Sequence, residues 1–217
     1  MGRKIDSNMP LPSNTKYRWD ECFAKLIIER IILNNIIFEI KDKPDLQSKE
    51  IGIEVTTAEE KDSLEMERLY TNIEYGLIKN KEKALKKIES LGGKISNGIL
   101  IHPGRTRTLK NIYNAFKEKL TLINKGTYKI FNNNYIFITD ENIIQENECL
   151  NIIKKLNSFQ EKSKYKFDKA YIYIFGDNLY EFDLRKETYK IFHFKSDEIY
   201  RISCDARKLV EQKEMEM

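Results

Sequence analysis

Apolar residues recur along this chain with two spacings, one typical of helices and the other typical of strands. Apolar positions three to four residues apart predict helices, and strict alternation or a short apolar run predicts strands. Gly, Pro and Asn residues between these segments predict the turns. In chain order, the pattern predicts a helix over 18–33, strands over 36–41 and 51–56, helical segments over 57–90, a helix over 108–124, a strand over 134–139, a helix over 142–159, and strands over 170–175, 179–184 and 189–194.

The order of these elements predicts one α/β domain with additions. The helical stretch after the strand at 51–56 is longer than an ordinary crossover between strands, which indicates a helical insertion beside the core. The expected organisation is a flexible N-terminal arm over 1–16, a core over 17–139 that includes the insertion over 77–97, a C-terminal helix and strands over 140–203 that complete the domain, and a charged tail over 204–217.

Composition limits the class of protein. At 217 residues, with 41% hydrophobic and 33% charged residues, the chain is expected to fold as a soluble globular protein. It contains no apolar run of about 20 residues and no signal-peptide core near its start, so we expect no membrane association and a cytoplasmic location. The three cysteines are odd in number and far apart, which favours neither disulfides nor a zinc ribbon. A net charge of +4 is too small to indicate a nucleic-acid partner by itself.

Candidate chemistry is concentrated between Asp45 and Thr56. Alternation in the strand places Glu54 and Thr56 on one face, and the turn at Pro44 lets Asp45 pair back against the strand. The hairpin therefore brings two carboxylates together. Because neighbouring carboxylates repel each other, the pattern predicts a divalent cation with oxygen ligands, Mg²⁺ or Mn²⁺, at this position.

These residues resemble the motif of the PD-(D/E)XK nuclease superfamily, in which Pro-Asp is followed, after a gap, by an acid, any residue and a lysine. Pro44, Asp45, Glu54 and Val55 match the motif, and Thr56 stands where the lysine is expected. The resemblance implies a restriction-endonuclease-like mixed central sheet flanked by helices, with a core order of helix, three strands, helix and strand. It also implies a metal held by Asp45, Glu54 and the Val55 carbonyl for cleavage of phosphodiester bonds in DNA.

Other residues of this chain could take the part of the missing lysine. Some members of the superfamily borrow a lysine from the helix that follows the motif, and Lys117 is the first candidate here, followed by Lys119 and Lys61. Members also often place a glutamate on the first helix near the metal, a position that Glu21 matches first and Glu29 second. The alternative for each of these side chains is an ordinary solvated helix residue.

A basic loop offers a candidate contact to nucleic acid. Arg105 and Arg107 follow a Pro-Gly turn, and their guanidinium groups could fork onto phosphate oxygens; the alternative is that they pack on acidic neighbours. The leading functional prediction is a metal-dependent DNA nuclease of a phage, mobile-element or defence context. A catalytically inactive nuclease fold that binds nucleic acid or protein is the alternative, and homodimer formation is left open.

Overall fold

The computed structural model describes residues 11, 15, 17–103, 108–176 and 178–215. Most of the predicted N-terminal arm, 1–16, therefore lies outside the described residues. The chain divides into two compact units, a sheet unit formed by residues 15–58 and 108–217 and a helical unit formed around residues 59–107.

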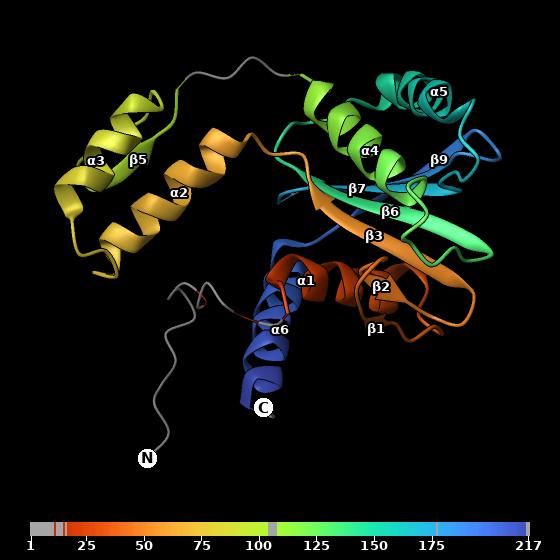
Figure 1. Ribbon diagram of the computed structural model, residues 1–217, viewed down its shortest axis with the longest axis horizontal. Helices are drawn as coiled ribbons and strands as arrows, with labels where there is room; N and C mark the ends of the chain where they lie inside the picture. The colour runs from red at the N-terminus through yellow and green to blue at the C-terminus, as the bar shows by residue number, and fades with distance from the viewer. Residues whose placement is uncertain (1–10, 12–14, 16, 104–107, 177, 216–217) are drawn as a thin grey trace. The chain divides into compact units, whose positions relative to one another are not determined.

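A seven-stranded sheet in the order β1-β2-β3-β6-β7-β8-β9 organises the sheet unit (Figure 1). Strands β3, β6 and β7 are parallel, and the remaining neighbours pair antiparallel. The predicted fold class, α/β with a mixed central sheet flanked by helices, is confirmed. The strands are β1 (Glu39–Ile40), β2 (Leu46–Gln47), β3 (Ile51–Thr57), β6 (Asn133–Asp140), β7 (Lys169–Ile174), β8 (Asn178–Asp183) and β9 (Thr188–His193).

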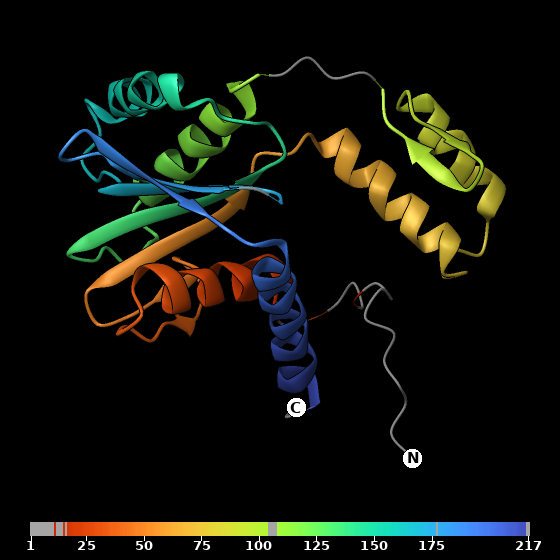
Figure 2. The same cartoon turned by 180° about the vertical axis from the view of Figure 1, so that it is seen from behind.

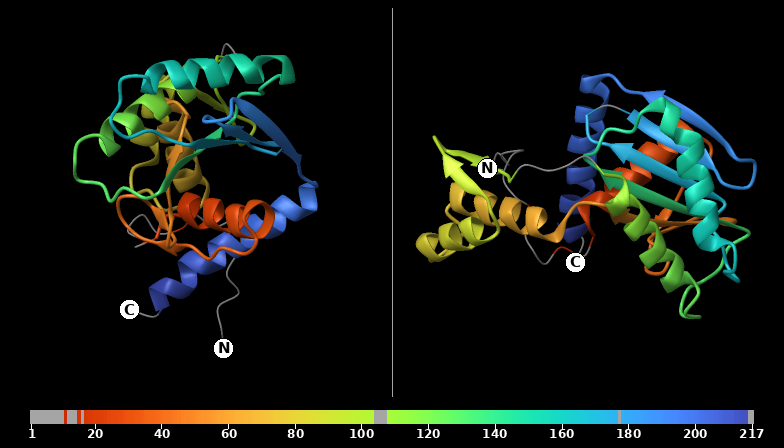
Figure 3. Two further views of the ribbon diagram at one scale, coloured as in Figure 1. Left: turned by 90° about the vertical axis from the view of Figure 1, so that its right-hand side faces the viewer. Right: turned by 90° about the horizontal axis from the view of Figure 1, so that it is seen from above.

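Helices cover both faces of this sheet. Helices α4 and α5 lie side by side on one face, and α1 and α6 lie on the other (Figure 3). Burial on both faces explains why the central strand β6 is a continuous apolar run rather than an alternating one. The helices are α1 (Trp19–Ile27), which continues as the π-helix η1 (Ile28–Ile32), α4 (Lys110–Ile123), the 3₁₀ helix η2 (Glu146–Glu148), α5 (Cys149–Gln160) and α6 (Ser196–Met215).

Alternate residues of β6 supply the two halves of the core. Ile136 and Ile138 pack under α4 and α5, while Tyr135 and Phe137 point to the opposite face. The first strand is shorter than the predicted 36–41, since only Glu39 and Ile40 pair with β2. The order α1, β1, β2, β3, α4, β6 matches the core order that the resemblance implied.

The C-terminal segment differs from the predicted charged tail. Residues 204–215 belong to α6, which runs beside α1 (Figure 2). Ile202, Ala206 and Val210 are buried, and their spacing of four residues forms one apolar stripe. Trp19 Nε1 also donates to the Ser203 carbonyl at 3.4 Å. Because many of the residues between these three positions are charged, the sequence pattern does not reveal this short apolar stripe. None of the helices in the described ranges has the length and apolar character that a membrane span requires.

The helical unit contains two helices and a small hairpin with a core of their own. Met66, Leu69 and Ile73 of one helix pack against Ala84 and Ile88 of the other. The insertion therefore begins near residue 59 rather than at the predicted 77, because the apolar face of its first helix is used within the unit. The first helix ends at Glu74, just before Tyr75 and Gly76. The elements are α2 (Lys61–Glu74), α3 (Lys81–Ser90), β4 (Lys94–Ser96) and β5 (Ile99–Ile101).

Candidate active site

The hairpin of β2 and β3 brings the two predicted carboxylates together. Leu46 pairs with Ile53, so the chain before Leu46 runs past Glu54 and Val55. The Val55 backbone N–H donates to Asp45 Oδ2 at 2.7 Å and fixes that carboxylate at the edge of β3. Asp45 immediately precedes the first residue of β2. Asp45 and Glu54 thus lie where the pairing between β2 and β3 stops and the edge of β3 becomes open.

Gly52 allows this close packing of the turn on the strand. A Cβ atom at this position would lie 2.7 Å from Pro44 Cγ and 2.6 Å from a ring carbon of Phe131. Non-bonded carbon atoms in folded proteins do not approach this closely, so the added Cβ atom would push Pro44 away from the strand. A side chain at position 52 would therefore displace the Pro44-Asp45 turn from β3.

Glu54 points into the layer between the sheet and α4, where it is 1% exposed. Lys119 of α4 donates to Glu54 Oε2 at 2.6 Å, and its Nζ is 3.9 Å from Asp45 Oδ2. The Tyr128 hydroxyl also lies 3.5 Å from Glu54 Oε2. One lysine therefore contacts both carboxylates.

The second oxygen of the Glu54 carboxylate has no hydrogen-bond partner among the described residues. Among the described atoms, Oε1 is buried and accepts no hydrogen bond. A buried carboxylate oxygen without a partner costs free energy unless a ligand satisfies it. The Val55 carbonyl points to the same side of β3 as the Val55 N–H that contacts Asp45, because both groups of a strand residue face one side. Asp45, Glu54 and the Val55 carbonyl thus offer oxygen donors at this edge of β3, and oxygen donors are the ligands that hard divalent cations prefer.

The N-terminal turn of α1 adds charged groups beside this hairpin. Arg18 is paired with Asp20, and its Nε lies 3.9 Å from Glu21 Oε1. Burial, helped by the nearby Asp45 and Asp20 carboxylates, raises the pKa of Glu21 from its ordinary value of 4.5 to about 7. Glu21 therefore titrates near neutral pH and can take up or release a proton there.

The two central carboxylates are also hard to ionise. Burial raises the pKa of Asp45, and Lys119 offsets part of that rise. Burial and the Asp45 charge together raise the pKa of Glu54. Four carboxylates and two cations give the site a formal charge of −2 when all are ionised, which one divalent cation would neutralise. These groups are Asp20, Glu21, Asp45 and Glu54 with Arg18 and Lys119.

We expect these pKa shifts to appear in the stability of the metal-free protein. A carboxylate whose pKa is higher in the folded state holds its proton there after the unfolded chain has lost it. The free energy of unfolding in EDTA should therefore fall as the pH rises from about 5 to 7, and Glu21→Gln should flatten that fall. Urea unfolding at several pH values measures both. A free energy of unfolding that rises over this range in the wild type, or an unchanged slope in the variant, would contradict the assignment.

The other predicted site residues lie in different surroundings. Lys117 is exposed and places its Nζ 5.1 Å from the Phe159 ring centroid, on the α5 side of α4. Thr56 lies on β3, two residues from Glu54 on the same face, and is half-buried. Glu29 accepts from the Phe38 backbone N–H at 2.6 Å and pairs with Lys25, which gives it a structural role. Lys61 begins α2 in the helical unit; Arg105 and Arg107 lie outside the described residues.

The periodicity of α4 carries the signal that favours Lys119 over Lys117. At about 100° per residue, Lys119 lies about 20° around the helix from the buried Ile112, whereas Lys117 lies about 140° away. A lysine within the apolar stripe of a helix must find a partner in the core. Tyr128 lies in the loop after α4 and carries no comparable signal in the sequence.

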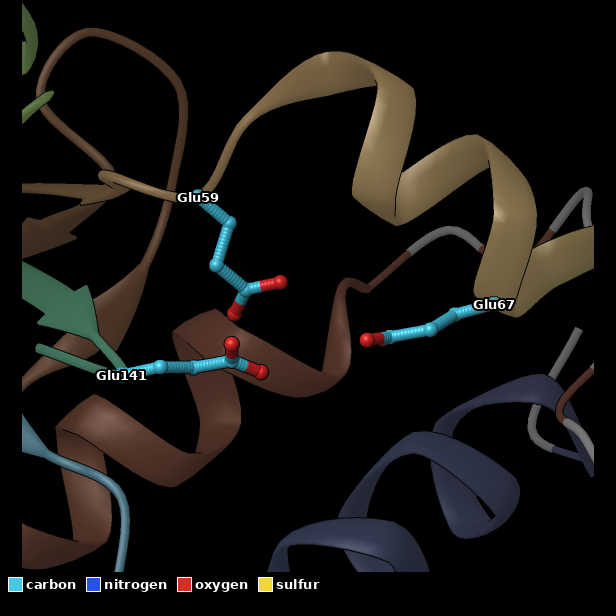
Figure 4. A group of neighbouring side chains, drawn as sticks. All are labelled: Glu59, Glu67 and Glu141. Carbon is cyan, nitrogen blue, oxygen red and sulfur yellow. The ribbon is translucent and has the colours of Figure 1, made fainter. Parts of the chain in front are cut away.

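Figure 4 shows a further group of acidic side chains. Glu59 precedes α2 and Glu67 lies on it, whereas Glu141 follows β6. The first two belong to the helical unit and the third to the sheet unit. The candidate metal site at the hairpin, in contrast, is built only from residues of the sheet unit, Asp45, Glu54 and Val55.

No protein-family model, no curated protein and no solved structure matches this chain.

Proposed function

We propose that this protein is a metal-dependent nuclease that hydrolyses phosphodiester bonds in DNA. The observation that carries the proposal is the buried Glu54 carboxylate, which shares Lys119 with Asp45 and has one oxygen without a partner among the described atoms. The resemblance of Pro44, Asp45, Glu54 and Val55 to the PD-(D/E)XK motif supports the choice of chemistry. The element order around these residues agrees with it.

In this proposal Asp45 Oδ atoms, Glu54 Oε1 and the Val55 carbonyl would hold Mg²⁺ or Mn²⁺. When bound, such an ion polarises a phosphate oxygen and lowers the pKa of a water molecule bound to the ion. Lys119 holds Glu54 through one of its three N–H donors and keeps the others for a water or a phosphate oxygen. Glu21, with a pKa of about 7, can accept a proton at the edge of the site.

Thr56 favours a second candidate function. A strand threonine cannot supply the positive charge of the motif lysine, so a protein with this residue could bind nucleic acid or protein without cleaving. The two candidates differ in what they require of Lys119. In an enzyme Lys119 must act on the reaction, whereas in an inactive protein it only balances the charge of two carboxylates.

The proposal is tested first by metal binding and cleavage. Asp45→Asn removes one charged ligand, so we expect it to weaken Mn²⁺ binding in calorimetry by tenfold or more and to reduce nicking of a supercoiled plasmid. Asp42→Asn, an exposed acid three residues away, is the matched control and should leave both measurements near wild type. An unchanged Mn²⁺ affinity in Asp45→Asn would remove the metal site, and wild-type protein without Mn²⁺-dependent nicking would favour the inactive candidate.

A further inference from the structure

A basic hollow lies between α4 and α5, away from the carboxylates. It has a volume of about 590 Å³ and is lined by four lysines, Lys117, Lys125, Lys162 and Lys164. All four are exposed, and its lining includes no carboxylate from the part of the chain that the structure describes. Four like charges around one hollow repel each other, so the arrangement favours an anionic partner.

Two side-chain amides hold the walls of the hollow in place. Asn124, just after α4, donates to the Tyr165 carbonyl at 3.0 Å and accepts from the Tyr165 N–H at 3.0 Å. Gln160, the last residue of α5, makes the same pair of contacts with the backbone of Phe167 at 3.0 Å each. The segment between them, which carries Lys162 and Lys164, is thus pinned at both helices. The backbone of the hollow is therefore preformed, so binding there requires little ordering of the main chain.

The lysines are available to a partner. Within the described ranges, none of the four forms an ion pair with a carboxylate. Lys117 Nζ lies 5.1 Å from the centroid of Phe159, and Lys164 Nζ lies 4.9 Å from that of Tyr165. These rings support the lysines without neutralising them, because a cation over an aromatic face keeps its full charge.

The geometry of α4 connects this hollow to the carboxylates. Lys119 projects from the β3 side of the helix and Lys117 from the α5 side, so the two regions are about one helix diameter apart, roughly 10–12 Å. One helical turn of a DNA duplex spans about 34 Å. A duplex with one phosphate at the carboxylates would therefore have further phosphates within reach of the hollow.

We propose that the four lysines of this hollow bind the phosphate backbone of the nucleic acid that the carboxylates act on. The inference rests on the proposed function, whose substrate it places on the α4–α5 side of the sheet. The volume of the hollow is that of a site for a whole ligand rather than for one small anion. Contacts to phosphates position the nucleic acid without reading its sequence.

The lysines have one competing explanation within the fold. Lys125 and Lys162 lie just beyond the C-terminal ends of α4 and α5, where a positive charge stabilises a helix. A purely structural role predicts a loss of thermal stability when these lysines are neutralised. A binding role predicts a loss of affinity for nucleic acid that is separate from any change in stability.

The test measures binding of a fluorescent DNA duplex in EDTA, where no cleavage occurs. The hollow variant combines Lys117→Gln, Lys162→Gln and Lys164→Gln. The control variant is Lys49→Gln, Lys110→Gln and Lys154→Gln combined, three exposed lysines of the same unit outside the hollow. Each variant removes three charges, so the effect on net charge is equal. Anisotropy at several salt concentrations gives the slope of log affinity against log salt.

We expect the hollow variant to bind DNA tenfold or more weakly at low salt. The slope of log affinity against log salt should become smaller by about 2 to 3, since each phosphate contact contributes about 0.9 to that slope. The control variant should change the slope by less than about 1. Equal effects of the two variants, or an unchanged slope in the hollow variant, would overturn the inference. DNA binding that depends on the hollow, without Mn²⁺-dependent cleavage, would instead contradict the proposed nuclease and still support the hollow as a binding surface.

Discussion

Replacing Lys119 by glutamine should lower the rate of DNA cleavage by about 10²- to 10⁴-fold, the range for loss of a general acid–base or water-positioning group. The reason is geometric: Lys119 Nζ is 2.6 Å from Glu54 Oε2 and 3.9 Å from Asp45 Oδ2, so this lysine reaches both carboxylates. Lys110→Gln is the matched control, because Lys110 is an exposed lysine at the start of the same helix. Single-turnover nicking of plasmid DNA in Mn²⁺ measures the chemical step.

A second variant separates a role in the reaction from a role in the fold. Thr56 lies on the same face of β3 as Glu54, so Thr56→Lys would direct an ammonium group toward the carboxylates from the strand. In the Lys119→Gln background, this substitution should restore part of the lost rate. A Lys119→Gln protein that folds normally and cleaves at the wild-type rate would exclude Lys119 from the reaction. A wild-type protein that fails to cleave in Mn²⁺ would support the inactive candidate instead.

Replacing Lys119 by methionine should destabilise the metal-free protein by about 3 kcal/mol, because among the described residues it leaves the buried Glu54 carboxylate with only the Tyr128 hydroxyl as a partner. Replacing both members of the pair, Glu54→Leu with Lys119→Met, should restore stability to the wild-type level or raise it by about 1–4 kcal/mol. The physical reason is that burial of two charges costs more than their attraction returns, unless a ligand completes the site. Urea unfolding in EDTA at pH 8 measures all three proteins.

The pH dependence of the Lys119→Met effect has a definite sign. Burial raises the pKa of Glu54 already in the wild type, and removal of the Lys119 cation should raise it further. A folded protein that holds this proton is less destabilised at low pH, so the cost of Lys119→Met should be smaller at pH 5 than at pH 8. Glu118→Gln, an exposed neighbour on α4, is the control. A double variant less stable than Lys119→Met alone would show that the pair stabilises the fold.

These two predictions describe one property of the site. Asp45 and Glu54 both have raised pKa values, and the buried Oε1 atom of Glu54 lacks a partner among the described residues. A fold selected only for stability would fill this position with apolar side chains. The retained cost is the reason to assign the site a ligand. If a cation binds the folded protein only, it should raise the apparent stability in proportion to the logarithm of its concentration.

Local patterns in the sequence determined most of the elements. Alternation over residues 51–56 predicted β3, and the apolar stripe of residues 108–124 predicted α4, because both signals depend only on neighbours along the chain. The order of elements predicted a mixed α/β sheet. The residues Pro44, Asp45 and Glu54 predicted a hairpin that brings two carboxylates together, which the structure confirms through the contact between Val55 and Asp45.

Other features depended on packing between distant segments. The sequence placed Glu54 on a polar strand face, but α4 covers that face and buries it. The sequence of residues 204–215 predicted a charged tail. In the structure this segment belongs to α6, which packs beside α1 and buries Ile202, Ala206 and Val210. A short apolar stripe gains its burial free energy only from a partner that the local pattern does not specify.

The choice of lysine shows most clearly what each level decided. The sequence alone determined that the motif lysine is replaced by Thr56 and that the following helix offers substitutes. Which substitute reaches the site depends on the rotation of α4 about its axis, and this rotation is fixed by the packing of Ile112 and Phe116 on the sheet. That packing turns Lys119 toward Glu54 and Lys117 toward Phe159. The apolar stripe of α4 already places Lys119 on the buried side of the helix, and tertiary packing decided that this side faces Glu54, because a helix settles in the orientation that buries the most apolar surface.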